Sequence, residues 1–180
     1  MRTTQLPGGR YPDPMETTPD AAADEALRLD RQICFSLHAA SRAFNGLYRT
    51  ALKDLGLTYP QYLAMLVLWE HGELPVKTIG TRLRLDSGTL SPLLKRLEAV
   101  GLVERRRSTE DERSVTVRPT AEGAALRERA RLVPRRIAAA TGLSLEGIGD
   151  LQERLSALTA KLDGADLGPG GLDGCAGPAG

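Results

Sequence analysis

The stretch from Leu85 to Gly101 constrains the fold of this chain more than any other. Large aliphatic side chains recur in it at intervals of three and four residues, and polar or basic residues occupy most other positions. The aliphatic positions are Leu90, Leu93, Leu94, Leu97 and Val100. This spacing predicts a helix with one apolar face that packs on a core and other faces that are open to a partner.

A shorter amphipathic run, residues 76–83, precedes this helix, and the short turn between the two predicts a helix-turn-helix. Asp86 or Ser87 is suited to cap the start of the second helix. Pro92 leaves another start open, because a proline inside a helix removes a hydrogen bond and crowds the carbonyl four residues earlier. In that case Ser91 is the cap and Pro92 is the first helical residue.

Two short extended runs follow Gly101. Residues 102–107 and 114–118 flank a polar, charged loop, which predicts a β-hairpin, the wing of a winged helix. From Lys77 to Arg107 there are eight basic and three acidic residues, a local charge of +5, whereas the whole chain carries +1. This local concentration of positive charge favours a nucleic acid as the partner.

Helical periodicity flanks the winged region on both sides. We expect a long first helix over residues 27–56, a buried second helix over 58–72 that Thr58 caps, a helix from Thr120 past Arg136, and a last helix over 143–162. One winged helix reads only a short half-site, so useful specificity needs two copies. We therefore expect the outer helices to form the contact of a two-fold homodimer.

The expected fold class is mainly α with a small β-hairpin wing: a winged helix-turn-helix with a terminal-helix dimerisation layer. Residues 1–24 are rich in Pro, Gly and Thr and are expected to be disordered, and residues 164–180 to be a flexible tail. The winged-helix domain then spans 25–163, with dimerisation helices over 25–56 and 120–163 and the DNA-binding winged helix over 75–118.

Composition argues against several other classes. No run of about 18 apolar residues predicts a membrane span, and the amino end lacks the basic start and apolar stretch of a secretory signal, so we expect a cytoplasmic protein with no membrane partner. Cys34 and Cys175 share no ligand spacing with the two histidines, so we expect no metal, cofactor or disulfide framework. The sequence shows no catalytic constellation, so we do not expect an enzyme.

Several segments resemble the MarR family of transcriptional regulators. They are LTYPQYL (57–63), LWEH (68–71), LDSGTLSPLLKRLE (85–98) and DERSV (111–115). With residues 32–37 and 40–42, the chain resembles the organic hydroperoxide resistance subfamily more closely, over about residues 27–162. The resemblance implies a repressor that binds pseudo-palindromic double-stranded operator DNA and releases it when an organic hydroperoxide oxidises a cysteine of the first helix.

In that subfamily the sensor cysteine corresponds to Cys34, and two tyrosines that hydrogen-bond to it correspond to Tyr48 and Tyr59. Cys34 and Tyr48 are fourteen positions apart, about 21 Å along one helix, so contact between them requires the partner subunit. The sulfenic acid formed on oxidation condenses with another thiol. Cys175 lies in the tail, unlike the resolving cysteine of two-cysteine members, so we favour a small thiol for this step over Cys175.

The recognition helix and the wing supply the residues expected to contact DNA. Ser87, Thr89 and Ser91 are expected to meet base edges or phosphates. The residues expected at the phosphate backbone are Lys95, Arg96, Arg105, Arg106 and Arg107. The resemblance makes Arg113 the minor-groove finger at the wing tip, with Asp111 orienting it.

Two other functions stay open at this point. In the first, a regulator of the same family is gated by a small phenolic or drug-like ligand held between the dimer layer and the winged core, and its response does not depend on Cys34. In the second, Cys34 serves a thiol peroxidase, which we rank lower because no second activating constellation accompanies this cysteine.

Overall fold

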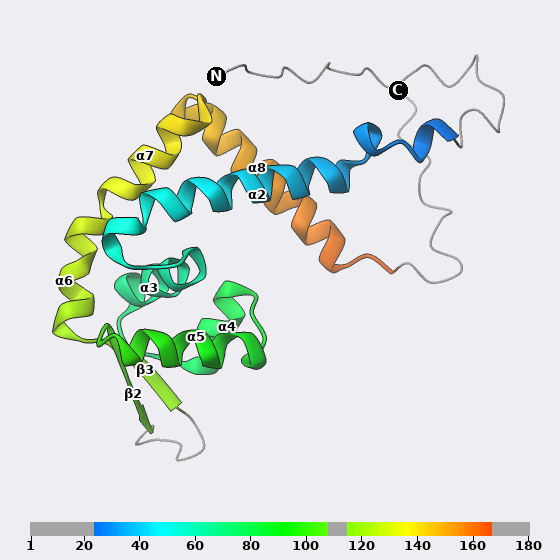
Figure 1. Ribbon diagram of the computed structural model, residues 1–180. Helices are drawn as coiled ribbons and strands as arrows, with labels where there is room; N and C mark the ends of the chain where they lie inside the picture. The colour runs from blue at the N-terminus through cyan, green and yellow to red at the C-terminus, as the bar shows by residue number, and fades with distance from the viewer. Residues whose placement is uncertain (1–23, 108–114, 167–180) are drawn as a thin grey trace. The chain divides into compact units, whose positions relative to one another are not determined.

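The computed structural model describes residues 24–107 and 115–166 (Figure 1). The elements in chain order are η1 (Leu29–Arg31), α2 (Ile33–Ala51), η2 (Lys53–Leu55), α3 (Tyr59–His71), β1 (Leu74–Pro75), α4 (Val76–Leu83), α5 (Ser87–Ala99), β2 (Val103–Arg107), β3 (Val115–Pro119), α6 (Ala121–Ala130), α7 (Leu132–Thr141) and α8 (Leu145–Asp163). The expected class, mainly helical with a hairpin wing, is confirmed. The chain divides into two compact units, one up to Val133 and one from Pro134 onward.

Helix α5 begins at Ser87, and Asp86 caps it. The two Asp86 carboxylate oxygens accept hydrogen bonds from the backbone amide and the hydroxyl of Thr89, at 2.8 and 3.0 Å. The later start, with Ser91 as the cap, is therefore wrong, and Pro92 lies inside the helix. The cap satisfies donors of the first turn, and this favours the early start even though Pro92 removes one bond further along.

The apolar face of α5 forms the centre of the core in the first unit. Leu90, Leu93, Leu94 and Leu97 are buried, together with side chains from α3, α4 and the sheet. Val100 was expected on the same face but is 58% exposed. The helix ends at Ala99, and the chain turns through Gly101 at a φ of 75°, so Val100 leaves the helical stripe.

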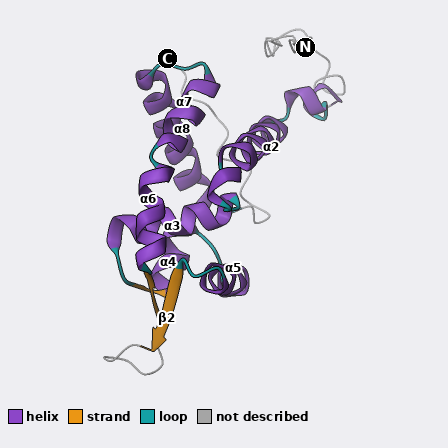
Figure 2. Ribbon diagram, turned by 60° about the vertical axis from the view of Figure 1, so that its left-hand side comes forward, coloured by secondary structure: helices purple, strands orange, loops and turns teal. Residues whose placement is uncertain are grey.

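The wing is a three-stranded antiparallel sheet with the strand order β1-β3-β2. The expected hairpin is confirmed, with Glu104 opposite Arg118 and Arg106 opposite Thr116. Figure 2 shows the strands projecting from the helices of the first unit. Strand β1 pairs with β3 through Leu74 and Pro75 only, and a two-residue strand has no alternation that a sequence pattern could reveal.

The first helix is shorter than expected. Gln32 is extended, with φ −81° and ψ 118°, and it separates η1 from α2. Upstream of this break, Arg31 pairs with Glu25 at 3.0 Å, and the Gln32 side chain donates to the carbonyl of Ala26. These bonds hold residues 25–32 as separate turns. Helix α2 therefore begins at Ile33, and Cys34 lies in its first turn.

The later helices begin close to where they were expected. Thr120 caps α6 as expected, and Ser144 caps α8, whose bounds lie within two residues of those expected. The single helix expected from Thr120 past Arg136 is instead two, because α6 ends at Ala130 and α7 begins at Leu132. Pro134 explains the restart, since a proline amide is tolerated in the first turn of a helix but not in its interior. None of the helices among the described residues is both long and apolar enough to cross a membrane.

Candidate functional site

Helix α5 presents a polar face to solvent. Ser87, Thr89, Lys95 and Arg96 are exposed, and Ser91 is half-buried. The Thr89 hydroxyl donates its proton to the Asp86 carboxylate. The hydrogen bonds from the Thr89 amide and hydroxyl lower the pKa of the Asp86 carboxyl below its usual value. The structure thus brings all five predicted α5 residues together on one element, with Thr89 partly engaged in capping.

The three wing arginines lie on alternating faces of strand β2. Arg105 turns toward α5, where its guanidinium is 3.9 Å from Glu98 and its side chain is 23% exposed. Arg106 points to the opposite face and is exposed, as is Arg107. Successive side chains of a strand alternate in this way, so the three arginines do not form one continuous cluster.

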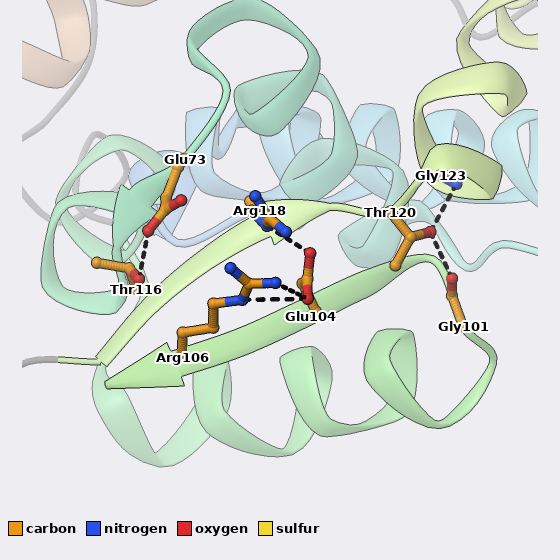
Figure 3. A network of polar contacts seen from close by, with 8 residues as sticks. All are labelled: Glu73, Gly101, Glu104, Arg106, Thr116, Arg118, Thr120 and Gly123. Atoms are coloured by element: carbon orange, nitrogen blue, oxygen red, sulfur yellow. Dashed lines mark hydrogen bonds and ion pairs between the residues drawn. The ribbon is translucent and has the colours of Figure 1, made fainter. Parts of the chain in front are cut away.

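Glu104 organises the outer face of the wing (Figure 3). Its Oε2 accepts from Arg106 Nε and Nη2 at 3.2 and 2.9 Å, and its Oε1 accepts from Arg118 Nε. The Arg118 guanidinium, together with that of Arg106, holds the pKa of the Glu104 carboxyl below its ordinary value. Sequence reasoning missed this group. Opposite charges at facing positions of the hairpin, Glu104 and Arg118, were the available signal.

Three of the predicted functional residues lie outside the described residues. They are Asp111 and Arg113, expected at the wing tip, and Cys175, the candidate resolving thiol. Within residues 24–107 and 115–166, no group of three or more His, Cys, Asp or Glu residues is placed to hold a metal ion.

Cys34 is an exposed, free cysteine at the second position of α2. The first turn of a helix carries the positive end of the helix dipole, which stabilises an anionic group there. Tyr48 lies fourteen positions further along the same uninterrupted helix, about 21 Å away by helical rise, so the two side chains do not meet within one protomer.

The two predicted tyrosines stack on each other where the end of α2 meets the start of α3. The ring centroids of Tyr48 and Tyr59 are 4.2 Å apart, and Tyr62 lies 5.9 Å from Tyr48. Burial, with a smaller effect from the neighbouring phenols, raises the pKa of Tyr48 to about 12, and burial also raises those of Tyr59 and Tyr62. All three phenols therefore keep their protons at neutral pH and are hydrogen-bond donors.

Tyr62 is the member of this aromatic group that sequence reasoning did not assign to the site. Its spacing of three from Tyr59 places both rings on one side of α3, and this spacing was the available signal.

Large apolar side chains are exposed on α2 and on α8. Those of α2 are Ile33, Phe35, Leu37, Phe44 and Leu47, and those of α8 are Leu145, Leu151, Leu155 and Leu162. Several of them recur at helical intervals, so each helix carries apolar surface that its own unit does not bury.

Comparisons with known proteins identify relatives of this chain. The family model described as transcriptional regulator SarA/Rot matches residues 46–129. The organic hydroperoxide resistance transcriptional regulator of Bacillus subtilis is 49% identical over 137 residues, which are 76% of this chain and 91% of that protein.

Solved structures of similar fold include DNA complexes. Reduced AbfR bound to DNA superimposes with a TM-score of 0.66 at 36% identity, over 78% of this chain and 96% of that chain. AbfR, a protein of Staphylococcus epidermidis, has also been solved in a disulfide form, with a TM-score of 0.54. A mutant MarR from Escherichia coli complexed with operator DNA has a TM-score of 0.65 at 25% identity, over 75% of this chain and 96% of that chain.

Proposed function

Because this chain belongs to the MarR family of winged-helix transcriptional regulators, we propose that it is a homodimeric repressor that releases its operator when an organic hydroperoxide oxidises Cys34. The observation that carries this proposal is an exposed thiol in the first turn of α2 and two protonated, stacked phenols where the other end of α2 meets the start of α3.

The chemistry begins at the Cys34 sulfur. The thiolate attacks the terminal peroxide oxygen and the O–O bond breaks, so the hydroxyl group stays on sulfur as a sulfenic acid. The alkoxide takes a proton from solvent and leaves as an alcohol. A second thiol then displaces water from this sulfenic acid and forms a disulfide. We propose a small cellular thiol for that step, with Cys175 as the weaker candidate. The apolar neighbours Ile33, Phe35 and Leu37 favour an alkyl hydroperoxide over hydrogen peroxide.

The proposed site needs two protomers. Tyr48 lies too far along α2 to donate to Cys34 of its own chain, so the partner's Tyr48 and Tyr59 supply the phenol donors. The exposed apolar residues of α2 and α8 support such an association, because exposed patches of this kind mark surfaces where a soluble protein binds a partner. We therefore propose that these two helices form the dimer contact.

DNA binding is proposed for the α5 face and the wing. In this proposal Ser87, Thr89 and Ser91 contact base edges or phosphates, and Lys95 and Arg96 contact the phosphate backbone, which their exposure on α5 supports. The exposed side chains of Arg106 and Arg107 extend this charge onto the wing. Asp111 and Arg113 remain a proposal for the wing tip that rests on the resemblance alone.

A second candidate is gating by a small phenolic or drug-like ligand. A hollow of about 390 Å³, lined by residues that include Leu55, Val100, Leu102, Leu126 and Arg129, favours it. This volume is in the range of sites for small organic molecules. A ligand-gated regulator would keep its response without Cys34, and this difference separates the two candidates.

A gel-shift experiment tests the proposal. The DNA upstream of the chain's own gene is titrated with reduced protein and with protein treated with cumene hydroperoxide, for the wild type, Cys34→Ser and Cys175→Ser. We expect peroxide to release DNA from the wild type and not from Cys34→Ser, with Cys175→Ser as the matched control that still responds when a small thiol is present. Release of DNA from Cys34→Ser at the same peroxide concentration would overturn the redox mechanism.

A further inference from the structure

Trp69, the only tryptophan of the chain, links two parts of the first unit that are distant in sequence. It lies in the last turn of α3 and is half-buried. Its indole Nε1 donates a hydrogen bond to the backbone carbonyl of Gly123, in the first turn of α6, at 2.8 Å. A helix carbonyl so near the start of α6 also accepts from within its own helix, so this bond is not needed to complete α6.

The first turn of α6 is joined closely to the end of α5 and the start of the wing (Figure 3). The Thr120 hydroxyl donates to the Gly101 carbonyl at 2.6 Å and accepts from the Gly123 amide at 3.0 Å. The Thr120 amide donates to the Leu102 carbonyl at 3.1 Å. Gly123 approaches that carbonyl so closely that a Cβ would lie 1.9 Å from its oxygen. A shift of the α6 start therefore moves the junction between α5 and β2.

On its other side, Trp69 reaches the tyrosines. Its ring meets Tyr62 edge to face, with centroids 6.2 Å apart and an interplanar angle of 70°. Tyr62 lies 5.9 Å from Tyr48, and Tyr48 stacks on Tyr59 at 4.2 Å. A continuous row of aromatic rings thus runs from the tyrosine pair to the indole that holds Gly123.

We propose that Trp69 is a positioning residue that couples the tyrosine pair to the DNA-reading elements through its hydrogen bond to Gly123. This inference rests on the proposed function, in which oxidation of Cys34 changes what Tyr48 and Tyr59 contact. Closely packed rings respond to such a change by moving together, since a core has few voids to absorb a shift. The indole N–H passes the shift to α6, and the Thr120 bridge passes it to the α5–β2 junction.

The decisive measurement is the ratio of the DNA dissociation constants of oxidised and reduced protein. Couplings of this kind typically change affinity by about 5- to 150-fold. Trp69→Phe keeps a ring beside Tyr62 and removes the N–H donor, and Thr120→Val removes the bridge to Gly101. We expect each substitution to lower the ratio at least fivefold. Thr116→Val is the matched control, because it removes the 2.7 Å bond from the Thr116 hydroxyl on β3 to Glu73 but lies off the proposed path (Figure 3).

A spectroscopic signal separates coupling from a merely structural role. The single indole N–H gives one resonance in a ¹⁵N–¹H spectrum, and we expect it to shift when wild-type protein is oxidised without DNA and to stay in place in Cys34→Ser. If Trp69→Phe does not fold by circular dichroism, Thr120→Val and this resonance decide the question. An unchanged ratio in the folded variants, or a resonance that oxidation does not move, overturns the inference. If the oxidised wild-type protein does not release DNA, the proposed function is overturned instead of this inference.

Discussion

Replacing Glu104 by glutamine tests how the wing contributes to DNA binding. The carboxylate holds the guanidinium groups of Arg106 and Arg118, so these three residues together carry one positive charge. Glu104→Gln raises that charge to two and replaces the anionic carboxylate that holds both arginines on the sheet with a neutral amide, which has one acceptor oxygen instead of two. In the proposed complex the wing lies against the phosphate backbone, and the released guanidinium groups gain access to phosphates.

The magnitude follows from counterion release. Each additional phosphate neutralised steepens the dependence of log K on log salt by about 0.9. One extra contact in each wing of a dimer gives a change of about 1.8. Over a fourfold rise in salt, from about 50 to 200 mM, affinity then falls about twelvefold more for Glu104→Gln than for the wild type. The gain at low salt is expected on operator and scrambled duplexes alike, because phosphate contacts carry no sequence information directly.

The assay is fluorescence anisotropy with both duplexes over this salt range. Glu128→Gln is the matched control, since it makes the same charge change in an exposed ion pair between Glu128 of α6 and Arg131, the residue that follows this helix. Equal slopes for the wild type and Glu104→Gln would show that releasing Arg106 and Arg118 from Glu104 adds no phosphate contact. An equal steepening in Glu128→Gln would show that only the net charge of the molecule matters.

Two further predictions concern α5 and the turn that follows it. Leu94→Ala, at a fully buried position of α5, is expected to lower the free energy of unfolding by about 2–5 kcal/mol in urea titrations. Val100→Ala, at an exposed position, is expected to lower it by clearly less. Equal losses in the two variants would contradict the assigned core. Folding lowers the pKa of the Asp86 carboxyl. The cap therefore stabilises the fold at pH values above the unfolded pKa of 3.8, and this contribution is lost as the pH falls through the lower folded pKa. Asp86→Asn should flatten this part of the acid-unfolding profile, and an unchanged profile would exclude a role for the carboxylate charge.

The elements predicted correctly from the sequence are those with local signals. The apolar spacing of α5, the Asp86 and Thr120 caps and the two extended runs around the charged loop of the hairpin each depend on side chains within a few residues of one another. The start of α2 could not be predicted in this way, because apolar residues continue upstream of Ile33. The helix stops there because of the extended backbone of Gln32 and its bond to Ala26, which no periodicity reveals.

The residues of the candidate site differ in the same way, between those with a local sequence signal and those without one. Cys34, Tyr48 and Tyr59 were identified through the family motif, and the structure brings the two tyrosines into contact. The Glu104 group and the Trp69 bond to Gly123 depend on which residues face each other across strands or helices. The Trp69 bond joins residues 54 positions apart, so local sequence patterns carry no information about it.

Because α2 begins at Ile33, this one helix carries both the thiol and one of the phenols of the proposed sensor, at opposite ends. Cys34 lies in its first turn and Tyr48 in its last, so a rigid rod separates the thiol from the phenols of its own chain. A two-fold axis relates the two protomers of such a dimer. If the thiol of one chain contacts the phenols of its partner, the partner's thiol therefore contacts the phenols of the first chain. In the proposed dimer, two sensor sites therefore form together or not at all. A disulfide at either site then strains the dimer contact that both protomers share. In this proposal a single oxidation event therefore affects the recognition helices of both protomers.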